Sequence, residues 1–179
     1  GAIFNVDKLR WMNGVYIRML NIDDLVQKAM PFFEAKFSSC TGNPLDTDYV
    51  RQVITLEQER AKTLAELPEL GDFFFSDELS YSTDMLLRDS KLDREKCRES
   101  LQAVLNVLTA MTSFKHDSLE STLRTLASEL SLKTKELFGL LRIAVTGKTA
   151  TPPLFQTMEV LGQEKCLRWI EAAIGRLQD

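Results

Sequence analysis

Apolar residues recur every three or four positions along most of the chain. This spacing covers residues 8–20, 22–37, 46–66, 93–112, 117–130, 133–146, 154–161 and 163–177. Such a period is typical of helices with one buried face. No run alternates polar and apolar residues between turn signals, as the strands of a hairpin do. The pattern therefore predicts an all-α fold.

The first half of the pattern predicts specific buried faces and breaks. The helix over 8–20 is expected to turn four side chains inward: Leu9, Met12, Tyr16 and Met19. Pro31 is expected to interrupt the helix over 22–37, because proline lacks the amide hydrogen that a helix interior needs. Residues 38–46 contain Gly42 and Pro44 and predict a loop. The long helix over 46–66 is expected to bury Val50, Val53, Ile54 and Leu64. Residues 67–77, with three successive phenylalanines, are interpreted as a connection that pins two subdomains together.

The second half of the chain shows the same helical spacing of apolar residues. Asp93 is expected to cap a helix that runs to about residue 112, and Asp117 or Ser118 to start the next one. The buried positions of these two helices are expected to be Cys97, Leu101, Val104, Leu105, Leu108, Leu119, Leu123, Leu126 and Leu130. Gly162 separates the last two helices, and the final one is expected to bury Leu167, Ile170, Ile174 and Leu177. No internal repeat is visible, which favours a globular helical array over a solenoid.

Composition narrows the classes of protein. The chain has 179 residues, of which 44% are hydrophobic and 27% charged, enough for one ordinary domain or two small ones. No apolar run is long enough to span a membrane. The net charge of -4 argues weakly against nucleic acid, because phosphate binding uses clustered lysine and arginine. A protein that reads a few unstacked RNA bases, however, needs only a local basic face.

The cysteines and the single histidine suggest no metal chemistry. Cys40, Cys97 and Cys166 lie far apart, and neither a CxxC pair nor a histidine-rich region accompanies them. Reduced thiols in a cytosolic-type compartment are the simple interpretation. His116 is expected to be a surface residue. No metal site is expected.

Residues 140–155 (LLRIAVTGKTATPPLF) read as a helix, a stop, a polar loop and a restart. Gly147 is expected to end the first helix, since glycine enters the left-handed cap conformation without steric cost. Thr151 is expected to be the N-cap of the next helix, with Pro152 at its first position. Arg142, Lys148 and the amides after Thr151 would then face one concave spot, where a helix N-terminus attracts anions.

This stretch strongly resembles the C-terminal anticodon-binding region of bacterial-type glutamyl-tRNA synthetases. Residues 4–17 (FNVDKLRWMNGVYI) and 158–168 (MEVLGQEKCLR) resemble the same family. The resemblance implies an all-α cage of two successive helical subdomains. In this interpretation residues 1–21 are the tail of the stem-contact domain, 22–75 the first anticodon-binding subdomain and 76–179 the second.

The resemblance also implies contacts with the anticodon bases. The family's arginine in the LR-x-A-x-TG helix is Arg142 here, and the threonine and leucine of its TPPL restart are Thr151 and Leu154. Arg124 lies at the spacing of a second anticodon-contacting arginine. Arg60 matches an arginine with which discriminating enzymes accept tRNA-Glu and reject tRNA-Gln. The alternatives are a capping role for Thr151, a packing role for Leu154 and a solvated Arg124.

Four more residues are implied in contacts with the tRNA backbone or stem. Arg10, Trp11 and Asn13 lie where the family meets the tRNA arm above the anticodon, although Trp11 can equally be buried at a subdomain junction. Lys148 replaces the arginine often found after the TG pair. It keeps a point charge for phosphate but loses the bidentate fork.

The chain lacks the His-x-Gly-His-type and Lys-Met-Ser-Lys-type motifs with which the resembled class forms adenylates. We therefore expect a non-catalytic piece of a glutamate–tRNA ligase that recognises tRNA-Glu. No cofactor is expected in the chain itself, since ATP and Mg²⁺ belong to the missing catalytic domain. The resemblance implies a cytoplasmic monomer without membrane contact. The alternative is a helical protein-interaction module without RNA binding, which the acidic charge favours and the presence of Arg142, Thr151 and Leu154 disfavours.

Overall fold

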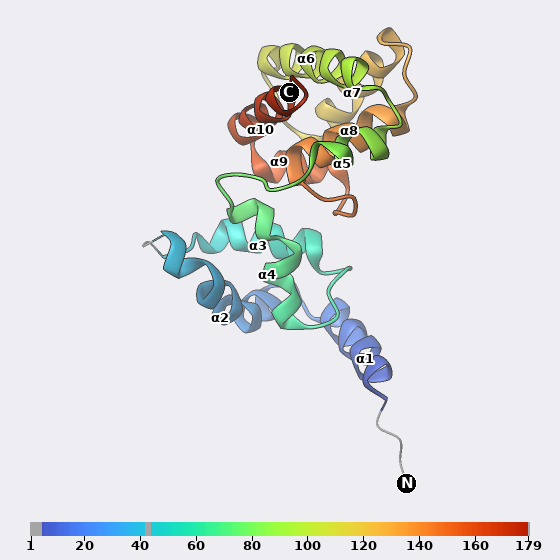
Figure 1. The fold of residues 1–179 in the computed structure, drawn as a ribbon. Coiled ribbons are helices and arrows are strands. Elements are labelled where there is room, and N and C mark those ends of the chain that lie inside the picture. Colours follow the sequence, from blue (N-terminus) through green and yellow to red (C-terminus); the bar gives the residue numbers. More distant parts are fainter. Residues whose placement is uncertain (1–4, 42–43, 179) are drawn as a thin grey trace. The chain divides into compact units, whose positions relative to one another are not determined.

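The computed structural model describes residues 5–41 and 44–178, apart from the side chains of 38–41 and 89. Every regular element in these residues is helical (Figure 1). The α-helices are α1 (Val6–Met19), α2 (Ile22–Thr41), α3 (Thr47–Glu57), α4 (Leu67–Leu70), α5 (Thr83–Ser90), α6 (Arg94–Ala110), α7 (His116–Glu129), α8 (Thr134–Thr146), α9 (Leu154–Leu161) and α10 (Gln163–Arg176). Two 3-10 helices, η1 (Leu64–Glu66) and η2 (Asp72–Phe75), flank α4. The all-α prediction is confirmed.

The chain divides into two compact units, Gly1–Phe75 and Ser76–Asp179. Each unit has a core of its own and is described by itself. The first unit contains α1 to α4 with both 3-10 helices, and the second contains α5 to α10. The separate assignment of residues 1–21 to a stem-contact domain stays a prediction.

Aromatic side chains fill the core of the first unit. The ring of Phe75 stacks on Phe37, with 4.6 Å between centroids, and meets the edges of Phe33 and Tyr49. The Tyr49 hydroxyl donates a 3.1 Å hydrogen bond to the carbonyl of Phe74. Such pairs add about 0.5–1.5 kcal/mol each beyond the burial of their area. The phenylalanine segment, interpreted above as a connection, therefore packs inside the first unit.

Pro31 does not interrupt α2, and that prediction is wrong. The helix runs through Pro31 to Thr41, beyond the predicted loop start at residue 38. A proline in a helix interior costs about 3 kcal/mol. One face of α2 buries Leu25, Val26, Ala29, Phe33 and Phe37 almost completely. Each large apolar side chain contributes about 1.5–3 kcal/mol, so the buried face outweighs the proline, whose own side chain lies at the surface. Gly42 of the predicted loop lies outside the described residues.

Helix α3 is shorter than the sequence predicted. Asp46 caps it, because its carboxylate accepts hydrogen bonds from the amides of Asp48 and Tyr49. The helix then ends at Glu57 instead of reaching residue 66. Beyond it, the Gln58 side chain donates 2.9 Å hydrogen bonds to the carbonyls of Ile17 and Leu20. These bonds to the end of α1 hold the chain in a turn, although no glycine or proline in the sequence indicates a turn at this point.

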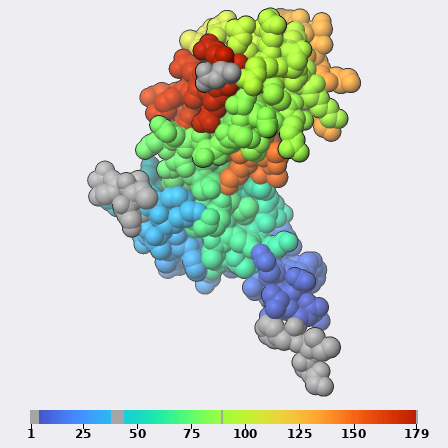
Figure 2. All heavy atoms as spheres, viewed as in Figure 1, coloured from blue at the N-terminus to red at the C-terminus, as the bar shows by residue number. Residues whose placement is uncertain are grey.

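Helix α1 packs on the first unit by a face other than the predicted one. Its buried residues are Gly14 and Ile17. The predicted inward side chains are exposed: Leu9, Met12, Tyr16 and Met19. Helix α1 stands out from the rest of the first unit, as its blue spheres show in Figure 2. The predicted burial of this stripe is therefore wrong for the described chain.

The second unit is a bundle in which α10 lies against α6 and α8, α5 against α8, and α7 against α9. Most predicted inward positions of α6, α7 and α10 are buried as expected, Leu105, Leu130 and Leu167 being half-buried. Helix α5 was not predicted. Helix α7 starts at His116, one residue before the predicted start, and the side chain of Lys115 at its N-cap makes no capping hydrogen bond to the helix. Cys97 and Cys166 are free and buried, whereas the side chain of Cys40 lies outside the described part.

Among the described residues, no helix is both long and apolar enough to cross a membrane.

Candidate functional site

The loop between α8 and α9 is held rigidly at its first end. Gly147 ends α8 in the left-handed conformation, with φ of 68°, and its amide donates a 2.8 Å hydrogen bond to the carbonyl of Ile143. The Thr146 hydroxyl donates to the carbonyl of Arg142 at 2.7 Å and accepts from the amide of Lys148 at 3.1 Å. The predicted glycine cap is confirmed. These bonds fix where the loop leaves the helix.

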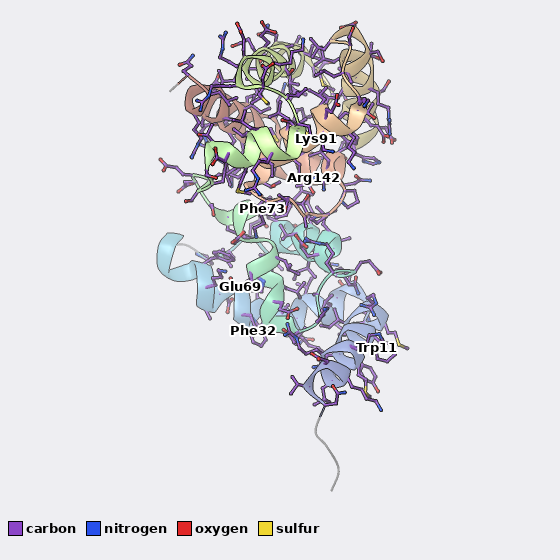
Figure 3. The ribbon with its side chains drawn as sticks, turned by 45° about the vertical axis from the view of Figure 1, so that its right-hand side comes forward. Trp11, Phe32, Glu69, Phe73, Lys91 and Arg142 are labelled. Carbon is purple, nitrogen blue, oxygen red and sulfur yellow. The ribbon has the colours of Figure 1, made fainter. Side chains whose placement is uncertain are left out.

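Arg142 ties α8 to the far end of this loop. Its half-buried guanidinium donates a 3.0 Å hydrogen bond from Nη1 to Oγ1 of Thr151. The Thr151 hydroxyl in turn donates to the carbonyl of Pro152 at 3.0 Å. Figure 3 shows Arg142 on its helix. Two residues that the sequence singled out separately are therefore directly bonded.

Thr151 is not the N-cap of α9, and that prediction is wrong. Helix α9 begins at Leu154, and Pro153 occupies the N-cap position without a side-chain bond. Pro152 and Pro153 have no amide hydrogen, so Thr151 is followed by two positions that cannot donate to its hydroxyl. The hydroxyl accepts from Arg142 instead. The first backbone amide after the two prolines belongs to Leu154.

Leu154 lies in the core of the second unit. Its side chain is 5% exposed, which favours the packing role over a flat surface for a base. Lys148 is half-buried in the loop before α9, and its amide donates a hydrogen bond to the Thr146 hydroxyl. Arg142 and Thr151 are therefore more exposed to solvent than Leu154.

Arg124 is held in place on α7 by two partners. Its Nε and Nη2 atoms donate to the same carboxylate oxygen of Glu120, at 2.9 and 2.6 Å. Its guanidinium carbon lies 5.6 Å from the ring centroid of Phe138 on α8. The ring of Phe138 meets Phe155 of α9 edge to face, with 5.0 Å between centroids. Arg124 is therefore an oriented side chain rather than a freely solvated one.

Phe138 connects the two arginines of the second unit. It precedes Arg142 by four residues on α8, so both lie on one helix face. Arg124 reaches the same ring from α7. The structure thus brings Arg124, Phe138, Arg142 and Thr151 onto neighbouring positions, and we call these four the arginine cluster. Sequence reasoning missed Phe138, because its neighbours come from two other helices.

Arg60 lies in the first unit, in the turn after α3. Its Nη1 atom pairs with Oε2 of Glu57 at 2.5 Å, and the Glu57 side chain is almost fully buried. The Arg60 side chain is 28% exposed. The buried carboxylate therefore orients this arginine, while part of its guanidinium reaches the surface.

The three residues predicted on α1 do not share a face. Trp11 is 64% exposed (Figure 3), and it lines a hollow of about 310 Å³ with Asp7, Arg10 and Lys62. Arg10 also pairs with Glu66. Asn13 lines a different hollow. Within the first unit Trp11 is an exposed residue and not a buried one, so the alternative of a buried junction does not hold there.

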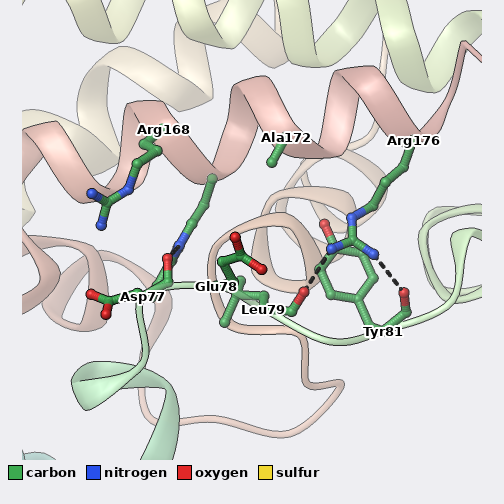
Figure 4. Close-up of a pocket in the computed structure, with 8 residues that line it drawn as sticks. Asp77, Glu78, Leu79, Tyr81, Arg168, Ala172 and Arg176 are labelled. Atoms are coloured by element: carbon green, nitrogen blue, oxygen red, sulfur yellow. Dashed lines mark hydrogen bonds between the residues drawn. The ribbon is translucent and has the colours of Figure 1, made fainter. Parts of the chain in front are cut away.

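A pocket of about 490 Å³ runs along α10, and Figure 4 shows its lining. Arg176 donates to the carbonyls of Leu79 and Tyr81 at 2.6 and 3.0 Å, and its guanidinium lies over the Tyr81 ring at 4.6 Å. The Trp169 indole donates to the carbonyl of Asp77 at 3.2 Å. Burial raises the pKa of Tyr81 to about 12. Helix α10 therefore fastens the segment 77–81, which the sequence did not indicate.

His116 links α7 to α9 through Glu159. The Glu159 carboxylate accepts hydrogen bonds from the His116 amide at 2.8 Å and from Lys115 Nζ at 3.0 Å, and lies 2.7 Å from His116 Nδ1. These bonds, the His116 amide first, lower the pKa of Glu159 to about 2. The bond to Glu159 raises the pKa of His116. His116 is thus a partly exposed residue with a defined partner.

Comparison with a family model and with known proteins points to one protein family. The model of the anticodon binding domain family matches residues 24–174. The chain is 48% identical over 178 residues to the glutamate–tRNA ligase of Dehalococcoides mccartyi strain BAV1, covering 99% of this chain and 36% of that protein. It is 42% identical over 179 residues to the glutamate–tRNA ligase of Roseiflexus castenholzii, covering 98% and 35%.

A solved structure of a glutamate tRNA ligase from Elizabethkingia meningosepticum superposes with a TM-score of 0.81, at 19% identity, over 98% of this chain and 33% of that one. At this identity the likeness shows the fold. The chain spans about a third of the length of each of these relatives.

Proposed function

Because this chain belongs to the anticodon binding domain family, we propose that it reads the anticodon of tRNA-Glu as the non-catalytic part of a glutamate–tRNA ligase. The relatives that share 42–48% of its residues are glutamate–tRNA ligases. In this role the chain selects the tRNA and holds it so that the acceptor end reaches a distant catalytic domain. Its contribution to the reaction is positioning and selection.

The hydrogen bond between Arg142 and Thr151 carries the proposal. It commits one nitrogen of the guanidinium and fixes the direction of the others. A guanidinium has five N–H donors in a rigid fork, so Arg142 retains donors for the edge of an unstacked base. Sequence-specific RNA recognition uses such base edges in single-stranded loops. The bond to Thr151 reduces the conformational entropy that Arg142 loses when RNA binds.

Arg124 and Phe138 supply a second kind of contact. Bases that are turned out of a loop stack on aromatic rings and on guanidinium planes. Glu120 and the ring of Phe138 hold the Arg124 guanidinium from two sides. We therefore assign Arg124 a stacking or edge contact with an anticodon base. Thr151 acts with Arg142 in recognising an anticodon base. Leu154 packs in the core and supports the start of α9.

Arg60 is assigned to discrimination between tRNA-Glu and tRNA-Gln. Glu57 orients its guanidinium, and an oriented charge penalises a base that offers a donor where an acceptor is needed. On α1, Arg10 and Trp11 are assigned to the tRNA arm above the anticodon, and Lys148 to a phosphate. The exposure of Trp11 supports a stacking contact with a ribose or base. Asn13 contributes to a separate part of that interface.

ATP and Mg²⁺ act in the catalytic part of the ligase outside this chain, and the chain itself holds no cofactor. The ligase is a monomer of the cytoplasm. The class of protein to which the relatives belong supports these three proposals.

A titration of the 179-residue chain with a tRNA-Glu anticodon stem-loop tests the proposal, with a stem-loop of scrambled anticodon as the control. Both are measured at two salt concentrations, because contacts to phosphate weaken with salt while base contacts persist more. Tighter binding of the cognate loop at both concentrations supports anticodon reading. Equal binding of both loops overturns it. Absence of binding, repeated with the full-length polypeptide, favours the protein-interaction module.

A further inference from the structure

Two of the arginines assigned to the anticodon are each held by a carboxylate three or four residues earlier in the chain. Arg60 pairs with Glu57, whose side chain is 1% exposed. Arg124 pairs with Glu120, whose side chain is 42% exposed. The buried carboxylate orients its arginine from the interior, whereas the exposed one also reaches solvent. This exposure allows Glu120, but not Glu57, to contact a ligand directly.

The Glu120 carboxylate uses only one of its two oxygens to hold Arg124. The Nε and Nη2 atoms of Arg124 both donate to Oε1, at 2.9 and 2.6 Å. The other oxygen, Oε2, accepts no hydrogen bond from the described residues. Both oxygens of a carboxylate are acceptors. Oε2 therefore retains its capacity to accept a hydrogen bond from a ligand.

Arg124 keeps donors next to this oxygen. Its Nη1 atom takes no part in the bonds to Glu120, and the N–H groups of a guanidinium lie in a fixed fork. The guanidinium lies over the Phe138 ring, with 5.6 Å to the centroid, and the Arg124 side chain is 54% exposed. Glu120 and Arg124 together therefore present an acceptor and donors at one place on α7.

An acceptor next to donors matches the pairing edge of a nucleobase and opposes a phosphate. Every base has an N–H donor and an acceptor on that edge, and unstacked bases of single-stranded RNA offer it to side chains. Acidic side chains accept from base amino groups. A phosphate has acceptor oxygens only, so the Glu120 carboxylate repels it. The opposite charges within the pair also cancel the attraction that an unpaired arginine has for any phosphate.

Resting on the proposed function, we infer that Glu120 is a further specificity-determining residue of the anticodon site. Its Oε2 atom accepts a hydrogen bond from the pairing edge of an anticodon base while Arg124 donates to the same edge. The Glu120 charge excludes phosphate from this position, and a built-in repulsion of a competing ligand is one source of specificity. Arg124 thereby contributes to base recognition rather than to sequence-independent attraction of RNA.

Titration with two RNA stem-loops tests this inference. One is the tRNA-Glu anticodon stem-loop, and the other has the same backbone but abasic nucleotides at the anticodon. In Glu120→Gln the amide oxygen still accepts from Arg124, whereas the amide nitrogen donates and no longer repels phosphate. The ratio of the two affinities is expected to fall about tenfold in this variant, as for the loss of one good base contact. Binding of the abasic loop is expected to tighten and to become more sensitive to salt, because a phosphate contact is gained.

Glu129→Gln is the matched control, because it removes the same charge from an exposed residue of the same helix. It is expected to change the affinity for both loops equally and to leave their ratio at the parental value. Urea unfolding of both variants shows that they fold. A Glu120→Gln variant with the parental ratio overturns the inference. An equal fall of the ratio in Glu129→Gln also overturns it, since net charge alone then accounts for the effect.

A third stem-loop, with a scrambled anticodon, separates this inference from the proposed function. A ratio that depends on Glu120, together with equal binding of cognate and scrambled loops, retains the base contact of Glu120 and overturns anticodon reading. Preference for the cognate loop without any effect of Glu120→Gln does the reverse. Absence of binding to all three loops, in the full-length polypeptide as well as in the 179-residue chain, overturns both.

Discussion

The guanidinium of Arg142 and the hydroxyl of Thr151 are joined by a 3.0 Å hydrogen bond that closes the loop between α8 and α9. The bond spans nine residues of sequence and connects α8 to a loop that ends in two prolines. It makes the arginine and the threonine one functional pair, so that a change in either is expected to alter the other.

Thr151→Val removes the acceptor of Arg142 while keeping nearly the same side-chain volume. A hydrogen bond to a charged group contributes about 1.5–3 kcal/mol, and we expect the variant to lose about 1–2 kcal/mol of unfolding free energy because water replaces part of the bond. Affinity for the cognate anticodon stem-loop is expected to fall about tenfold, equivalent to about 1.4 kcal/mol. Thr151→Ser keeps the hydroxyl and should match the parent in urea unfolding and in RNA titration. A Thr151→Val variant with unchanged affinity would show that the pair does not position Arg142.

Gly147→Ala tests the left-handed end of α8. The backbone there has φ of 68°, and an added Cβ would lie 3.2 Å from the Tyr81 ring. The conformational cost is about 1–2 kcal/mol, to which the close contact adds. Gly175→Ala in α10 is the matched control, because nothing lies within 4 Å of its added Cβ. There we expect a gain of up to about 1 kcal/mol from helix propensity. Urea unfolding of both variants should therefore shift in opposite directions.

Helical periodicity predicted the second unit better than the first. In α6, α8 and α10 the apolar stripe faces neighbouring helices of the same unit, so the stripe and the core coincide. In α1 the stripe was recognised correctly but its burial was not. Periodicity reports which residues share a face and contains no information on what covers that face. The misplacement of the α1 stripe follows from this limit.

Other differences have local causes. The end of α3 depends on Gln58, which bonds to residues about forty positions earlier, and no short-range signal encodes such a contact. The sequence predicted Thr151 as the N-cap with Pro152 at the first helical position. Pro153 disfavours the helical conformation at Pro152, and α9 begins at Leu154. Phe138 was missed because its significance comes from Arg124 and Phe155 on other helices. The sequence therefore indicated the arginines of the cluster but not the ring that places them together.

Phe138→Leu is expected to weaken RNA binding more than folding. Leucine retains most of the buried volume but lacks the ring under the Arg124 guanidinium and the edge contact with Phe155. The lost cation–π contribution at an exposed site is about 0.5–1 kcal/mol. We expect a several-fold loss of affinity for the cognate stem-loop and a small change in unfolding free energy. Phe138→Tyr preserves the ring and serves as the control. Equal affinities of the leucine and tyrosine variants would contradict a role for the ring.

The contact of Glu159 with His116 predicts a pH dependence of stability. The folded pKa of His116 is raised above its ordinary 6.5, so its contribution is complete below pH 6.5 and disappears as pH rises through the raised value. The folded pKa of Glu159 is about 2 against 4.5, so its contribution is complete above pH 4.5 and disappears as pH falls toward 2. Two neighbouring charges also act on the pKa of His116: Asp117 raises it and Lys115 lowers it.

Glu159→Gln should therefore destabilise the second unit most between pH 4.5 and 6.5, where both contributions are present. The difference from the parent is expected to shrink at pH 9 and again near pH 2. It does not vanish at pH 9, because the His116 amide and Lys115 still bond to the carboxylate of the parent. Urea unfolding at these pH values measures the difference directly. A difference independent of pH would mean that the amide cap alone supports the contact.

Arg176→Ala is expected to release the segment that joins onto α5. The Arg176 guanidinium forks between the carbonyls of Leu79 and Tyr81 and packs over the Tyr81 ring. A lysine cannot donate to both carbonyls in this geometry, so Arg176→Lys should resemble the alanine variant. We expect a loss of about 2–3 kcal/mol, since half-buried carbonyls lose a charged donor. Limited proteolysis and hydrogen exchange of residues 77–82 should accelerate at the same time.

Arg168→Ala is the control on the same helix face, because that arginine is exposed and a surface substitution changes stability by about 0.5 kcal/mol or less. Unchanged exchange in residues 77–82 of Arg176→Ala would show that Trp169, through its bond to Asp77, is sufficient to fasten the segment.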